Sequence, residues 1–121
     1  MDGTIVYIPS DSGPVVVTGV PWPMELETMQ ALVGGHVQTF PIFHGRLLGW
    51  CNEDGWAKRL PLNFVASQMF GRQLLGNVYL TGWLDPAIED ASPIPEEFVR
   101  SYRHNRGRET TIEELLKEIN G

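Results

Sequence analysis

Apolar residues change their spacing at residue 24, and this change decides which kind of fold the chain can form. The two segments before it, Thr4–Ile8 and Val15–Val20, are rich in β-branched residues, which favour strands. From Met24 to Val33 the spacing becomes helical, and Gly34 follows as a left-handed helix stop. The helical face consists of Leu26, Met29, Leu32 and Val33. We therefore predict an early helix that packs on a sheet through the first three of these residues.

The segments that follow alternate strand and turn signals. Strands are expected at His36–Phe43, Arg46–Cys51 and Gly76–Gly82, with a tight turn over Asn52–Gly55 and a short helix over Phe64–Phe70. Strands that cluster around one helix indicate an α+β fold. We predict a small antiparallel or mixed sheet of five or six strands with one helix packed on it, followed by a C-terminal helical tail.

Two parts of the chain differ in character, and we place a core domain at residues 1–84 and a tail at residues 85–121. Prolines and acidic residues over Asp85–Pro95 indicate a linker, after which Glu96–His104 and the residues after Thr111 are expected to be helical. The last helix carries an apolar stripe of Ile112, Leu115, Leu116 and Ile119. A short helix needs a surface to cover, because it is marginal alone in water. We expect this tail to join two copies in a homo-oligomer, with docking on its own sheet as the alternative.

Composition narrows the function classes. The 121 residues are 42% hydrophobic and 20% charged, which suits one domain with a buried core. A single cysteine excludes an internal disulfide framework and suits a reducing compartment, and the apolar runs fall far short of the ~20 residues of a membrane span. The net charge of −6 disfavours non-specific binding to nucleic acid. We expect a cytoplasmic protein that needs no cofactor and binds neither membrane nor nucleic acid.

Positive charge is concentrated in residues 46–84, which hold four basic and two acidic residues. Aromatic side chains are interleaved with these bases, so that a planar base could stack on a ring while a guanidinium takes a phosphate. The candidate ligand-binding residues are Arg46, Trp50, Asn52, Trp56, Arg59 and Asn63. The alternative is that the tryptophans fill the core and the two asparagines hydrogen-bond with turn backbone.

Catalytic and metal-binding patterns are weak. Cys51 with His36 or His44 could form a nucleophile and base, but no flanking motif supports the pair. The histidines are too scattered for a metal site, and Glu53 and Asp54 are neighbours in a turn. We therefore predict no catalytic residue, no metal and no enzymatic activity.

Four short motifs occur in order: a helix ending in Leu-Val-Gly-Gly at Gly35, the Asn-Glu-Asp-Gly turn at 52–55, Leu-Pro-Leu-Asn at 60–63, and Gly-Asn-Val at 76–78. This series resembles a family of small domains of unknown function found mainly in bacteriophages and phage-rich bacterial genomes. The resemblance covers about residues 4–84 and implies a phage-type origin and the α+β fold, but no catalytic residue. The longer link between Asn63 and Gly76 departs from the family pattern.

Three function classes follow. The first is a non-enzymatic protein that binds a small phosphorylated or nucleotide-like ligand; small phage proteins of this kind include counter-defence sponges that sequester nucleotide immune signals. The second is an acidic inhibitor or DNA mimic that acts on a host defence enzyme, although five bases interrupt the nine acids of residues 85–121. An enzyme is the third. We expect the first, acting in the cytoplasm of a bacterial host.

Overall fold

The computed structural model describes residues 2–43, 46–85, 90–104 and 107–120, and its centre is a six-stranded mixed sheet in the order β3-β4-β5-β1-β2-β8. The strands are β1 (Asp2–Ile8), β2 (Val16–Pro21), β3 (Val37–Ile42), β4 (Leu47–Asn52), β5 (Val78–Gly82) and β8 (Arg108–Thr111). β8 is parallel to β2, and the other neighbouring strands are antiparallel. Beside this sheet, β6 (Leu84–Asp85) pairs with β7 (Asp90–Ala91). The α+β fold with a mixed sheet is thus confirmed.

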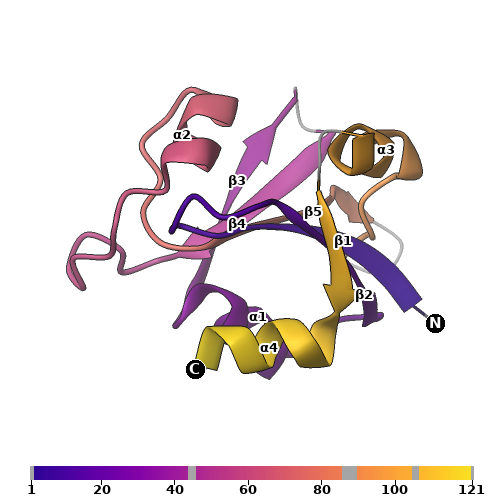
Figure 1. The fold of residues 1–121 in the computed structure, drawn as a ribbon, viewed down its shortest axis with the longest axis horizontal. Coiled ribbons are helices and arrows are strands. Elements are labelled where there is room, and N and C mark those ends of the chain that lie inside the picture. Colours follow the sequence, from indigo (N-terminus) through magenta and orange to yellow (C-terminus); the bar gives the residue numbers. More distant parts are fainter. Residues whose placement is uncertain (1, 44–45, 86–89, 105–106, 121) are drawn as a thin grey trace.

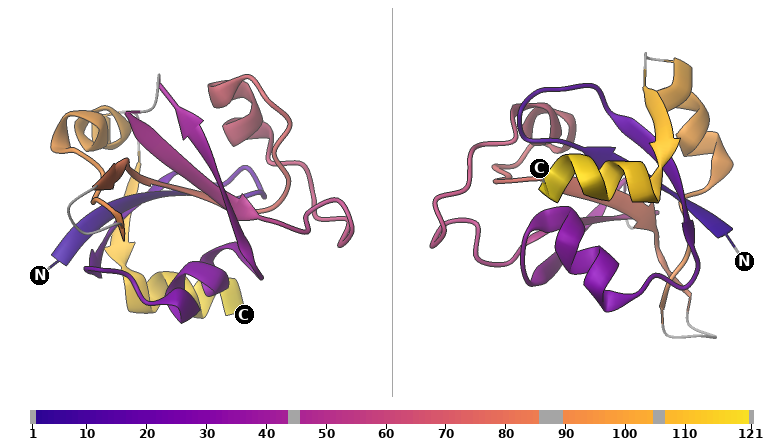
Figure 2. Two further views of the ribbon diagram at one scale, coloured as in Figure 1. Left: turned by 180° about the vertical axis from the view of Figure 1, so that it is seen from behind. Right: turned by 60° about the horizontal axis from the view of Figure 1, so that its bottom comes forward.

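Four helices cover the two faces of the sheet in pairs (Figures 1 and 2). One face carries α1 (Leu26–Val33) and α4 (Ile112–Asn120), and the other carries α2 (Phe64–Phe70) and α3 (Glu96–His104). The alternation of β1 feeds a separate core on each face, because Ile5 and Tyr7 pack toward α1 and α4 while Val6 and Ile8 pack toward α2 and α3. Among the described residues, no helix is both long and apolar enough to span a membrane.

The buried face of α1 differs from the prediction in one residue. Leu32 and Val33 are buried and Met29 packs partly against the same core, but Leu26 is 58% exposed. Leu26 stands in the first turn of α1, at the end away from the buried pair, so the prediction that it packs on the sheet is wrong. Gly34 ends the helix with φ 79°, the left-handed conformation expected of it.

The C-terminal segment completes the sheet of its own chain. β8 lies beside β2, with Arg108 opposite Val16, and no strand was expected there. In α4, Ile112 and Leu115 are buried, and the rest of its apolar stripe packs partly against the same core. Thr111 caps α4, since its Oγ1 accepts a hydrogen bond from the Glu114 N–H at 3.2 Å. Residues 86–89 of the predicted linker lie outside the described residues.

Candidate functional site

A cavity of about 210 Å³ lies beside β3 and β4, on the face that also carries α2. Phe40 and Leu74, which belong to the core of that face, form part of its wall together with the half-buried Cys51. The polar and aromatic lining residues include Gln38, Glu53, Trp56, Arg72 and Gln73. Three separate parts of the chain therefore contribute: the edge strand β3, the end of β4 with the loop after it, and the connection from α2 to β5.

The loop after β4 carries Trp56 and is fixed at its start by Asn52, which is buried. The Asn52 Nδ2 donates to the carbonyl oxygen of Val33 at 3.1 Å, and its Oδ1 accepts from the Asp54 N–H at 2.7 Å. The second bond closes the turn with a side chain in place of backbone. Asn52 thereby ties the turn to the end of α1.

Asn63 fixes the other end of the loop and is completely buried, with 0% of its surface exposed. Its Nδ2 donates to the carbonyl oxygens of Ile8 and Gly76, both at 2.9 Å. Its Oδ1 accepts from the Ala66 N–H at 3.0 Å, which caps α2. All of these partners are backbone groups, so the Asn63 amide is occupied inside the protein and supports the loop.

Arg72 is held over the wall of the cavity. Its guanidinium carbon lies 4.8 Å from the centroid of the Phe40 ring, within the range of a cation–π contact. The Phe40 ring in turn lies over Gly49, where an added Cβ would come 2.1 Å from the ring. A side chain at Gly49 would therefore collide with the Phe40 ring, so glycine at this position of β4 leaves room for the ring that carries the guanidinium.

The Cys51 thiol does not have the features of an activated nucleophile. Burial raises the pKa of the Cys51 thiol, and the nearby charge of Arg72 opposes that shift only in part. The thiol is therefore protonated at neutral pH, whereas a nucleophile reacts as thiolate. His36 is exposed on the surface, and His44 lies outside the described residues. Among the residues with described positions, no group of three or more metal-binding side chains is arranged to hold an ion.

The structure brings two of the six predicted site residues to this cavity, Asn52 and Trp56. The Trp56 indole is 72% exposed. Arg59 is exposed in the same loop with φ 54°, but it does not line the cavity. Asn63 supports the loop from inside.

The remaining two predicted residues lie elsewhere. Trp50 points to the opposite face of the sheet, where its ring stacks on Tyr79 at 5.5 Å and its Nε1 donates to the Thr81 Oγ1 at 2.8 Å. Arg46 pairs with Glu97 of α3 at 3.0 Å and lies 5.1 Å from the Phe98 ring centroid. Neither contributes to the cavity.

Sequence reasoning missed three polar lining residues, Gln38, Arg72 and Gln73. Arg72 belongs to the net-positive segment, and it follows Gly71, which ends α2 with φ 66°. An isolated basic residue directly after the glycine that ends a helix could have marked Arg72 as a candidate site residue. The two glutamines carried none, because only the fold brings β3 and the α2–β5 connection together.

The comparisons with known proteins identify one family. Residues 3–106 match the model of a domain of unknown function, DUF3846. No match to a curated protein or to a solved structure was found. The match extends beyond residues 4–84, over which the sequence resemblance was expected, and includes α3. The chain therefore belongs to the DUF3846 family of domains of unknown function.

Proposed function

We propose that this protein binds a small phosphorylated or nucleotide-like ligand at the cavity beside Trp56, without catalysis. The observation that carries the proposal is the presence of a largely exposed indole, Trp56, and of a guanidinium that lies over the Phe40 ring, Arg72, at one cavity. An exposed aromatic face stacks on a nucleobase and is worth roughly 1–3 kcal/mol per base. A guanidinium presents paired donors that match two oxygens of a phosphate.

Two glutamine side chains could fix the orientation of a bound nucleobase by hydrogen bonds. Gln38 and Gln73 line the same cavity and offer both donors and acceptors to the edge of a heterocycle. Pockets that bind small molecules combine an apolar wall with a few such polar groups. Here the wall is supplied by Phe40, Leu74 and Leu75.

The size of the cavity favours a small ligand group. Its volume of about 210 Å³ is below the roughly 300–1,000 Å³ of pockets that enclose a drug-sized ligand. One base or one phosphate would enter it, and the rest of a larger nucleotide would lie on the exposed indole. Lys58 and Arg59 of the same loop do not line the cavity, but they add positive charge to this part of a chain whose net charge is −6.

Isothermal titration of the full chain with mononucleotides and cyclic dinucleotides tests the proposal. Trp56→Ala and Arg72→Ala should each weaken binding at least about tenfold, which corresponds to about 1.4 kcal/mol. Trp83→Ala and Arg100→Ala are matched controls, because both residues are exposed and lie outside the cavity. Equal losses in variants and controls would rule out this cavity. Absence of nucleotide binding would favour the acidic inhibitor instead.

The finer biological role is part of the same proposal. A bacteriophage protein that sequesters a nucleotide immune signal in the host cytoplasm would need only binding, and no catalytic group. To distinguish sequestration from catalysis, the protein is incubated with a nucleotide and heated, and the released nucleotide is analysed. An intact nucleotide supports a sponge, and an altered one indicates an enzyme.

We also propose a homodimer joined through the C-terminal segment. The apolar stripe of α4 covers the sheet of its own chain, so a dimer through this segment would exchange it between two copies that make the same contacts. Light scattering of the full chain tests this, and a monomeric mass at tens of micromolar would exclude it.

A further inference from the structure

A second cavity, of about 430 Å³, lies between α4 and the turn that joins β1 to β2. It shares no lining residue with the cavity beside Trp56. Its polar side chains are Tyr7, Asp11, Asn77, Arg108 and Glu118. The question is which ligand chemistry these groups would accept.

Tyr7 is a buried residue, 3% exposed, that lines this cavity. Within the described part of the chain, no hydrogen bond of its hydroxyl is found, and its oxygen is not one of the fully buried atoms without a partner, so solvent in the cavity reaches it. Burial raises the pKa of the Tyr7 phenol, and the charges of Asp11 and Glu118 raise it further. The hydroxyl therefore stays protonated and lies within electrostatic reach of two carboxylates.

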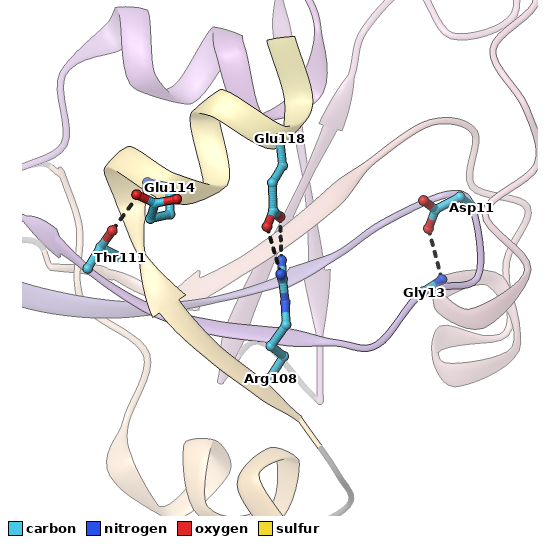
Figure 3. A network of polar contacts seen from close by, with 6 residues as sticks. All are labelled: Asp11, Gly13, Arg108, Thr111, Glu114 and Glu118. Carbon is cyan, nitrogen blue, oxygen red and sulfur yellow. Dashed lines mark hydrogen bonds and ion pairs between the residues drawn. The ribbon is translucent and has the colours of Figure 1, made fainter. Parts of the chain in front are cut away.

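The two carboxylates are differently engaged (Figure 3). Both oxygens of Glu118 accept hydrogen bonds from Arg108, the first from Nη1 at 2.7 Å, so these two charges compensate each other. Among the described residues, Asp11 uses only its Oδ1, which accepts from the Gly13 N–H at 2.8 Å in the turn. With Arg108 and Glu118 neutralised as a pair, Asp11 leaves the cavity with one uncompensated negative charge.

The remaining wall is apolar. Val16, Leu115 and Ile119 line the cavity, together with Pro9 and Pro14 of the turn. An alkyl chain would find van der Waals contact along α4, while its charged end lies at the acidic turn. An anion would instead meet the charge of Asp11, because both Nη atoms of the Arg108 guanidinium already donate to Glu118 and its Nε is buried.

We propose that this cavity binds a primary alkylammonium group, with the ammonium between Asp11 and the Tyr7 hydroxyl and the alkyl chain against Leu115 and Ile119. An ammonium has three donors and no acceptor, which fits the free carboxylate oxygen of Asp11, the phenol oxygen and the outer side of Glu118. The group belongs either to a free diamine or to a lysine side chain of another protein. Both present a primary ammonium at the end of an alkyl chain.

A ligand series on the full chain tests the charge requirement. Butane-1,4-diamine and Nα-acetyl-lysine methylamide are titrated by NMR at millimolar concentration, with butan-1-ol as the neutral control. We expect at least one amine to shift the resonances of Tyr7 and of the Asp11 turn, and the alcohol to leave them unchanged. Binding by the diamine points to a free amine, and binding by the lysine amide alone points to a protein side chain.

Two variants test the named groups. Asp11→Asn keeps an acceptor for the Gly13 N–H but removes the charge, and it should weaken the amine at least about tenfold. Tyr7→Phe removes only the hydroxyl and should weaken it about three- to tenfold. Glu113→Gln is the matched control, an exposed acid of α4 outside the cavity, and should leave the affinity unchanged.

Three results would overturn the proposal. They are equal binding of alcohol and amine, equal loss of affinity in Asp11→Asn and Glu113→Gln, and no resonance shift with either amine. None of them bears on the nucleotide proposal, because the two cavities have no residue in common.

Discussion

The Asn63 Nδ2 donates a hydrogen bond of 2.9 Å to the carbonyl oxygen of Ile8, and this bond joins the start of α2 to the end of β1. The same nitrogen donates to Gly76, so one buried amide connects the loop that carries Trp56, the central strand and the start of β5. Buried polar groups of this kind cost little while paired and a great deal when a partner is removed.

Asn63→Ala should therefore destabilise the protein by about 2–4 kcal/mol, since it removes a helix cap and leaves buried backbone groups without partners. Asn63→Asp should also destabilise it, because it keeps the cap acceptor but loses both donors and buries a charge. Urea unfolding of the full chain measures both. Asn120→Ala, an exposed position on α4, is the control. Unchanged unfolding of Asn63→Ala would contradict the central position of this amide.

The tryptophans on either side of the Asn52–Gly55 turn should respond differently to removal. Trp50 is half-buried, stacks on Tyr79 and donates to Thr81, so Trp50→Ala should cost about 2–4 kcal/mol of folding free energy. Trp56 is largely exposed, and Trp56→Ala should stay within about 0.5 kcal/mol of wild type. Thermal unfolding of the two variants side by side checks the contrast, and similar melting temperatures would refute it.

The two ends of α1 provide a further matched pair. Leu32 is fully buried at the C-terminal end, and Leu32→Ala should destabilise the protein by about 2–5 kcal/mol through a cavity in the core. Leu26→Ala makes the same chemical change at an exposed site and should cost little. The denaturant midpoints of the two variants, compared with that of the wild type, measure this difference in stability. A large loss in Leu26→Ala would mean that the first turn packs on the sheet after all.

Local patterns in the sequence predicted most elements of the fold, but not β8 or the short β6–β7 pair, which lies where a linker was expected. The α1 and α2 helices and the five antiparallel strands of the six-stranded sheet follow from spacing, turns and stops in the sequence. β8, with the sequence Arg-Glu-Thr-Thr, has no apolar residue and forms by pairing its backbone with β2. Two β-branched threonines are its only local strand signal, and its pairing partner is distant in the sequence.

The candidate site was less accessible to sequence reasoning. Asn52 and Trp56 follow from the turn motif, but Arg72 and Gln73 reach the cavity only because the loop and the α2–β5 connection are joined, as in the bridge between Leu62 and Leu75. The alternative to ligand binding, that the two asparagines hydrogen-bond with backbone groups, describes both Asn52 and Asn63. Side chains that satisfy distant carbonyls cannot be distinguished from ligand-binding amides without the fold.

The ion pair between Arg108 and Glu118 should make stability depend on pH. The hydrogen bonds and charge of Arg108 lower the pKa of the Glu118 carboxyl below its ordinary value near 4.5. A lowered pKa in the folded state stabilises the protein above the unfolded value, and this contribution is lost as the pH falls through the folded value. Glu118→Gln should therefore lower the melting temperature at pH 7, and the difference from wild type should close below about pH 4.5.

Because both side chains are partly exposed, added salt should reduce the effect of the Arg108–Glu118 ion pair on the melting temperature. Glu113→Gln makes the same charge change on α4 outside the pair, and a pH profile identical to that of Glu118→Gln would show that the ion pair contributes nothing.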